Sequence, residues 1–130
     1  MQPVTCVRLA GLLGGLAVAL GAFAAHGMKA HFDAAALTTF ETGVRYQMYH
    51  AFALGLCAAL GAAGWRTQRA AVAFVVGTVL FSGSLYGLVW LQAGWLGPVT
   101  PLGGVAFLIG WLLLALSRRD APLAPETGAA

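Results

Sequence analysis

The sequence has very little charge. Lys, Arg, Asp and Glu together make up 8% of its 130 residues, and only four residues are acidic. A soluble domain carries roughly 25% charged residues, so this chain cannot cover the surface of a soluble globule. Its seven Lys and Arg are scattered, with no run longer than Arg118–Arg119, which argues against a nucleic-acid partner. With 60% hydrophobic residues and a mean hydropathy of +0.83, the composition predicts an integral membrane protein.

Motifs for catalysis and metal binding are also missing. The chain has no Ser-His-Asp order, no HExxH and no glycine-rich phosphate loop, so we predict no catalytic residue and no cofactor. Cys6 and Cys57 lack metal-ligand spacing and are expected to be unpaired thiols. A metal site built from His26, His31 and His50 is a minor alternative, because their spacing matches no familiar ligand motif.

Four apolar stretches are present. A bilayer core of about 30 Å requires about 20 apolar residues in a helix. The stretches cover residues 9–25, 46–64, 70–91 and 102–116. The sequence therefore predicts an all-α membrane protein, a bundle of four transmembrane helices that forms one domain over residues 1–117. The polar, proline-containing tail, residues 118–130, is predicted to be disordered and cytoplasmic.

The segment between the first two spans has a different pattern. Asp33 can cap a helix, and Glu41 and Arg45 are four residues apart in the favourable order for a helical ion pair. An apolar stripe runs along the same helix: Leu37, Phe40, Val44 and Met48. The pattern predicts an amphipathic helix at the membrane interface, running into the second span.

Basic residues near the span ends predict the orientation. With four spans, one side carries five arginines: Arg8, Arg66, Arg69, Arg118 and Arg119. The other side carries only Lys29 and Arg45. We therefore expect both termini in the cytoplasm and the amphipathic helix on the outer face of an inner membrane.

The first apolar run could be read as a signal peptide, because Ala22-Phe23-Ala24 fits a cleavage pattern. Its glycine spacing favours a retained helix instead, since small residues let membrane helices approach closely. The same spacing recurs in later spans, and the predicted packing glycines are Gly11, Gly15, Gly83, Gly87 and Gly110.

Several longer motifs carry a family resemblance. They are GAFAAHGMK (21–29), FETGVRYQMYHAFAL (40–54), LFSGSLY (80–86), TPLGG (100–104) and GW (110–111). On these residues the chain resembles the domain-of-unknown-function family of small four-span inner-membrane proteins typified by bacterial YgdD, with small multi-pass relatives in animals. At Ala24 the family more often has glycine. The resemblance implies a four-helix multi-pass membrane protein and brings no established activity, so no catalytic residue is carried over.

The polar residues of the spans form a candidate cluster in the outer half of the bundle. Its members are His26, Tyr46, His50, Ser82, Tyr86 and Thr100. We expect His26 to lie beside the face that carries Tyr46 and His50. Hydrogen bonding between helices is the simplest role for the cluster, and a site for an ion or small ligand is the alternative, since ionisable residues within a membrane are often functional.

These observations favour a non-enzymatic accessory or structural membrane protein of unknown molecular function. The alternative is a small transporter or channel, acting as a homo-oligomer with an outward-facing polar pocket. A membrane enzyme that uses a histidine as acid or base is a third class. The expected partners are the lipid bilayer and either further copies of the chain or another membrane protein.

Overall fold

The computed structural model describes residues 1–120. Its four long helices are α1 (Pro3–His26), α2 (Ala34–Ala62), α3 (Gln68–Trp90) and α4 (Val99–Ala115), and the short 3-10 helix η1 (Gly94–Leu96) precedes α4. Within the described residues there is no β-strand, only an isolated bridge between Trp65 and Arg119. The all-α prediction is therefore confirmed.

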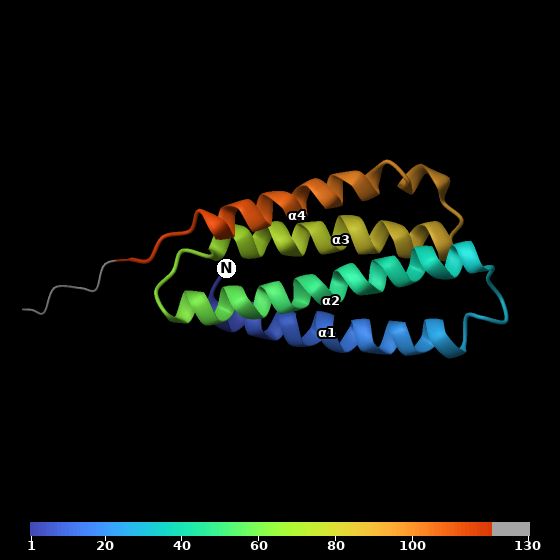
Figure 1. Cartoon of the computed structure of the whole chain (residues 1–130), viewed down its shortest axis with the longest axis horizontal. Coiled ribbons are helices and arrows are strands. Elements are labelled where there is room, and N and C mark those ends of the chain that lie inside the picture. Colours follow the sequence, from blue (N-terminus) through green and yellow to red (C-terminus); the bar gives the residue numbers. More distant parts are fainter. Residues whose placement is uncertain (121–130) are drawn as a thin grey trace, which may run out of the picture.

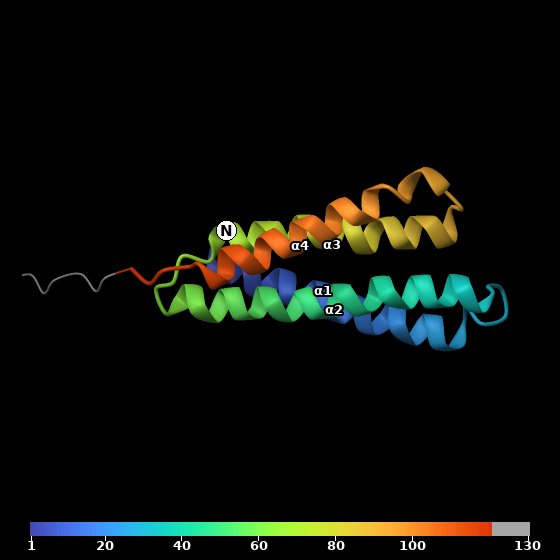
Figure 2. The ribbon, with the colours of Figure 1, turned by 45° about the horizontal axis from the view of Figure 1, so that its top comes forward.

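Consecutive helices run antiparallel and form two hairpins, α1–α2 and α3–α4 (Figure 1). Each helix contacts its neighbours in the chain, and α2 packs on α3 to join the hairpins. Figure 2 shows the two hairpins as two layers. The N-terminus, the α2–α3 turn and the end of α4 lie at one end of the molecule (Figure 1).

Helix α2 contains both the predicted amphipathic segment and the predicted second span in one helix. Asp33 caps it as predicted, because its Oδ1 accepts a hydrogen bond from the Ala36 amide at 2.8 Å. From there the helix runs unbroken for 29 residues, about 43 Å. Its early threonines donate to carbonyls four residues back, so they satisfy their hydroxyls within the helix. The amphipathic segment is thus the first half of α2, and its position at the interface stays a prediction.

Within residues 1–120, three helical segments are long and apolar enough to cross a membrane: α1, α3 and Gly94–Ala115. Helix α2 is not among them, because its apolar half includes the polar Gln47 and His50. Four spans therefore remain a prediction from the sequence.

Glycines and phenylalanines interlock along the α3–α4 contact. A Cβ built on Gly110 would lie 2.6 Å from the ring of Phe74, and Gly77 faces the ring of Phe107 in the same way. A third glycine, Gly103, lies directly against the backbone of Phe81. The residue numbers in each pair have the same sum, so one antiparallel register runs through the whole contact. Only glycine allows the two backbones to come this close.

The α1–α2 contact is less tight. Cβ atoms added at Gly14 and Gly21 would lie 3.8 Å from Ala51 and 3.5 Å from Val44, which are ordinary van der Waals distances.

Three of the five predicted packing glycines are not at a contact between helices. Cβ atoms added at Gly11, Gly15 and Gly83 would meet nothing within 4 Å among the described residues. Gly87 packs on Leu96 of η1 rather than on a long helix. The prediction that Gly11, Gly15 and Gly83 pack against another helix of the same chain was therefore wrong. A membrane helix is apolar on all sides, so the spacing of its small residues does not reveal which side faces a neighbouring helix.

The end of the described chain also differs from the prediction. The Arg66 amide donates to the Arg118 carbonyl, and the Asp120 amide donates to the Gly64 carbonyl, both at 2.9 Å. Residues 118–120 are therefore bound to the α2–α3 turn, although the sequence predicted disorder from residue 118. The rest of the predicted tail, residues 121–130, lies outside the described residues.

Candidate functional site

Gln47 links three helices near the middle of the molecule. The side chain is 2% exposed. Its Nε2 donates to the carbonyl of Leu13 on α1, and its Oε1 accepts from the hydroxyl of Tyr86 on α3, both at 2.8 Å. The amide thus uses a donor and an acceptor at once, which fixes the heights of α1 and α3 relative to α2.

His50, one turn further along α2, connects that helix to α4. Its Nδ1 lies 2.7 Å from the carbonyl of Tyr46, which can only accept, so Nδ1 carries the proton. Its Nε2 then accepts from the indole N–H of Trp111 at 3.2 Å. The imidazole stacks on Phe107 with ring centroids 3.4 Å apart and planes 4° from parallel. A neutral histidine satisfies every one of these contacts.

Serines of α3 complete the set of hydrogen bonds between helices. Ser82 donates to the Gly43 carbonyl of α2 at 2.7 Å. Ser84 and Thr100 of α4 share a hydrogen bond of 2.6 Å, in the same register as the glycine–phenylalanine pairs. These polar groups lie between two apolar clusters, one around Leu54 and Phe74 and one around Met28 and Phe40.

Within residues 1–120, every buried side-chain nitrogen and oxygen has a hydrogen-bond partner. In lipid an unpaired polar group costs several kcal/mol, so each partner also determines how the helices can pack. The arrangement therefore acts chemically as a set of hydrogen-bonded links between helices.

The structure divides the candidate cluster. Tyr46 and His50 are neighbours, with ring centroids 6.3 Å apart. Ser82 and Tyr86 lie at the α2–α3 contact, and Thr100 lies at the α3–α4 contact with Ser84.

His26 does not belong to this group, and its predicted position beside Tyr46 and His50 was wrong. Gly14 is the α1 residue that faces Ala51, next to His50. His26 lies twelve residues further along α1, about 18 Å away, and its side chain is exposed. The prediction placed the start of the second span at Tyr46, whereas α2 begins at Ala34. His50 is consequently near the middle of α2 rather than near its outer end.

The predicted ion pair between Glu41 and Arg45 is not formed either. The one salt bridge within the described residues joins Arg66 to Asp120, at 2.6 Å. Glu41 and Arg45 are both exposed, and exposed charges gain little from holding one paired geometry.

The described residues also bring no group of three His, Cys, Asp or Glu side chains together as metal ligands. Cys6 and Cys57 are buried and not joined by a disulfide.

Sequence reasoning missed Gln47, Ser84 and Phe107. A signal for Gln47 was available in a spacing of three and four residues along α2, and the residues on it are all buried in the structure: Phe40, Gly43, Gln47, His50, Leu54 and Cys57. The purely apolar stripe predicted from the sequence instead includes Val44 and Met48, which face α1. The face toward α3 was missed because it contains polar residues.

The apolar helices with internally bonded polar groups define a small integral membrane protein. Comparison with known proteins supports this class. A family model described as "Protein of unknown function (DUF423)" matches residues 20–104. The chain belongs to this family.

Curated relatives carry the name UPF0382 membrane protein. The chain is 43% identical to YwdK of Bacillus subtilis (strain 168), an alignment covering 78% of this chain and 85% of the relative. It is 42% identical to a Haemophilus influenzae protein, covering 84% and 89%. It is also 42% identical to the UPF0382 inner membrane protein YgdD of Escherichia coli (strain K12), covering 81% and 82%. No solved structure matches the chain. The predicted family and membrane class are confirmed, and the family has no assigned molecular function.

Proposed function

We propose that the chain is a non-enzymatic component of the inner membrane with four spans, and that it serves as an accessory or structural subunit of a membrane assembly. The observation that carries this proposal is the use of its polar groups. Gln47 joins three helices, and both ring nitrogens of His50 are engaged in links within the chain. These residues act in holding the helices together.

Helix α2 serves as the fourth span in this proposal. It packs against both α1 and α3, each of which is apolar and long enough to cross. A helix held between two spans must lie beside them in the bilayer, and its polar Gln47 and His50 are buried, as lipid requires.

Four spans place both termini on one side, and the excess of arginines supports the cytoplasm as that side. The test is a pair of reporter fusions after Arg119. We expect green fluorescent protein to be active there and alkaline phosphatase, which needs the periplasm, to be inactive. The reverse result would overturn the orientation.

The accessory role is tested by purifying the tagged full chain from native membranes in a mild detergent. We expect a different membrane protein to copurify in a fixed ratio and to stay bound through size-exclusion chromatography. An unrelated tagged four-span protein expressed at the same level is the control. Recovery of the chain alone, or as a homo-oligomer only, would contradict the proposal.

One observation favours the transporter or channel as a second candidate. A surface hollow of about 470 Å³ lies at the opposite end of the molecule from the two ends of the described chain, between the start of α2 and the end of α3 (Figure 1). Its polar lining residues are His31, Asp33, Thr39 and Gln92. In the proposed orientation this hollow opens outward. Ion or small-solute flux into liposomes that contain the purified chain would support transport, and flux equal to that of empty liposomes would exclude it for the solutes tested.

A further inference from the structure

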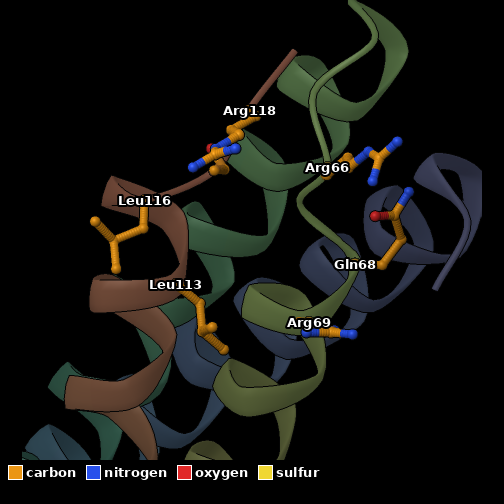
Figure 3. A pocket seen from close by; sticks show the side chains of 7 residues that line it. Arg66, Gln68, Arg69, Leu113, Leu116 and Arg118 are labelled. Carbon is orange, nitrogen blue, oxygen red and sulfur yellow. The ribbon is translucent and has the colours of Figure 1, made fainter. Parts of the chain in front are cut away.

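A second hollow, of about 400 Å³, lies at the end of the molecule that carries both ends of the described chain. Figure 3 shows it between the start of α3, near which Arg66, Gln68 and Arg69 lie, and the end of α4 with the residues that follow it, where Leu113, Leu116 and Arg118 lie. Its volume is within the range of small-molecule sites, about 300–1,000 Å³. The side-chain links of Gln47 and His50 described above do not involve this hollow.

The hollow has an excess of positive charge. Three arginines line it, and the carboxylate of Asp120 pairs with one of them, Arg66. Among residues 1–120, neither Arg69 nor Arg118 has a carboxylate within 4 Å. The side-chain amide of Gln68 can donate further hydrogen bonds to an anion. Guanidinium groups bind phosphate well, because their N–H groups match two of its oxygens.

Backbone hydrogen bonds hold the two sides of the hollow together. The Arg66 amide donates to the Arg118 carbonyl, and the Asp120 amide donates to the Gly64 carbonyl. The Nε of Arg119 also donates to the Ala63 carbonyl at 3.0 Å. Segments more than fifty residues apart in the sequence are thereby joined, so Arg66 and Arg118 stay on opposite sides of one site.

The wall below the charges is apolar. Leu113 of α4 is half-buried, and Leu116, the C-cap residue of α4, is 68% exposed. In a membrane protein such an exposed apolar side chain faces acyl chains. A charged rim above an apolar wall at the end of two spans matches the two parts of a phospholipid, an anionic headgroup and its hydrocarbon chains.

We propose that this hollow binds an anionic phospholipid, with the headgroup phosphate held by Arg69 and Arg118 and an acyl chain lying along Leu113 and Leu116. The inference rests on the four-span arrangement proposed above, because that arrangement puts the ends of α3 and α4 in the headgroup layer. It does not depend on the accessory role, since lipid binding is measured on the purified chain alone.

The test is native mass spectrometry of the full chain in a non-ionic detergent, titrated with phosphatidylglycerol or with phosphatidylcholine. We expect one phosphatidylglycerol to bind more tightly than phosphatidylcholine. In the double variant R69Q/R118Q its affinity should fall about 25-fold, since each arginine near anionic lipid contributes about fivefold. The control double variant R8Q/R45Q loses the same charge outside the hollow and should bind as the wild type does.

Three results would overturn the proposal. They are equal binding of the two lipids, equal loss in both double variants, and unchanged phosphatidylglycerol binding in R69Q/R118Q. A further arm adds millimolar inorganic phosphate to the lipid-bound protein. Phosphate that displaces the lipid at this concentration would assign the hollow to the free anion instead. Equal melting temperatures for the variants and the wild type establish that the variants fold, which we expect because all four arginines are exposed.

Discussion

The α3–α4 hairpin and the α1–α2 hairpin use small residues differently. In the α3–α4 hairpin, a phenylalanine of the opposite helix packs directly against each of three glycines: Gly77, Gly103 and Gly110. The contact is with the phenylalanine ring at Gly77 and Gly110, and with the phenylalanine backbone at Gly103. In the α1–α2 hairpin, Gly14 and Gly21 lie at distances where an alanine would also fit. The difference shows that a glycine matters for packing where backbones touch, and that its spacing along the helix is a weaker guide.

The two hairpins also differ in their polar links. Gln47 joins α2 to α1 through the Leu13 carbonyl and to α3 through Tyr86. Among the hydrogen bonds of residues 1–120, only the short one between Ser84 and Thr100 joins α3 to α4. Close backbone packing thus dominates one hairpin, and hydrogen bonding by a buried amide contributes more to the other.

The largest effect is expected from Gly103→Ala. Its new Cβ would collide with the backbone of Phe81, which cannot move aside as a side chain can. We expect a loss of about 3 kcal/mol of stability, the upper part of the range for overpacking, measured by thermal unfolding in detergent. Gly14→Ala in the looser hairpin is the matched control and should change stability little. Equal melting temperatures for the two variants would remove the contrast between the hairpins.

A smaller loss, about 1–2 kcal/mol, is expected from Gln47→Leu, because two hydrogen bonds between helices disappear together. Tyr86→Phe removes one of them and should cost about 0.6 kcal/mol. Tyr49→Phe, at an exposed tyrosine, is the control. If the losses for Gln47→Leu and Tyr86→Phe add fully in the double variant, the two side chains do not interact as described.

Removal of the link between α2 and α4 should have a measurable but modest effect. A double-mutant cycle of His50→Ala and Trp111→Phe should give a coupling of about 0.6 kcal/mol, the average for hydrogen bonds between membrane helices. The comparison cycle pairs His50→Ala with His26→Ala. Those two changes should be additive, because His26 is exposed near the far end of α1. Coupling between His50→Ala and His26→Ala would instead support the predicted contact between these two histidines, which the structure contradicts.

The smallest effect is expected from Gly83→Ala on the α3 surface. An added Cβ meets no atom within 4 Å in the described chain, and alanine favours a helix over glycine by about 0.5–1 kcal/mol. Stability in detergent should stay the same or rise slightly. A clear loss that grows with protein concentration would show instead that this surface packs against a second copy.

Much of the fold could be predicted from the sequence. Low charge and long apolar runs require a membrane environment, and within a bilayer the backbone must satisfy its own hydrogen bonds, which favours helices. The Asp33 cap was recognisable because its carboxylate precedes a regular helical pattern. The quoted motifs were also sufficient to predict the family.

The tertiary structure alone decided which side of each helix faces another helix. In water, burial and hydrophobicity coincide, and a helix shows its inner face through its apolar stripe. In lipid the outer face is equally apolar, so Gly83 and Gly103 look alike in the sequence although only Gly103 touches a neighbouring backbone. Gln47 was missed because a search for apolar stripes passes over the buried face of α2, where this polar side chain finds its partners.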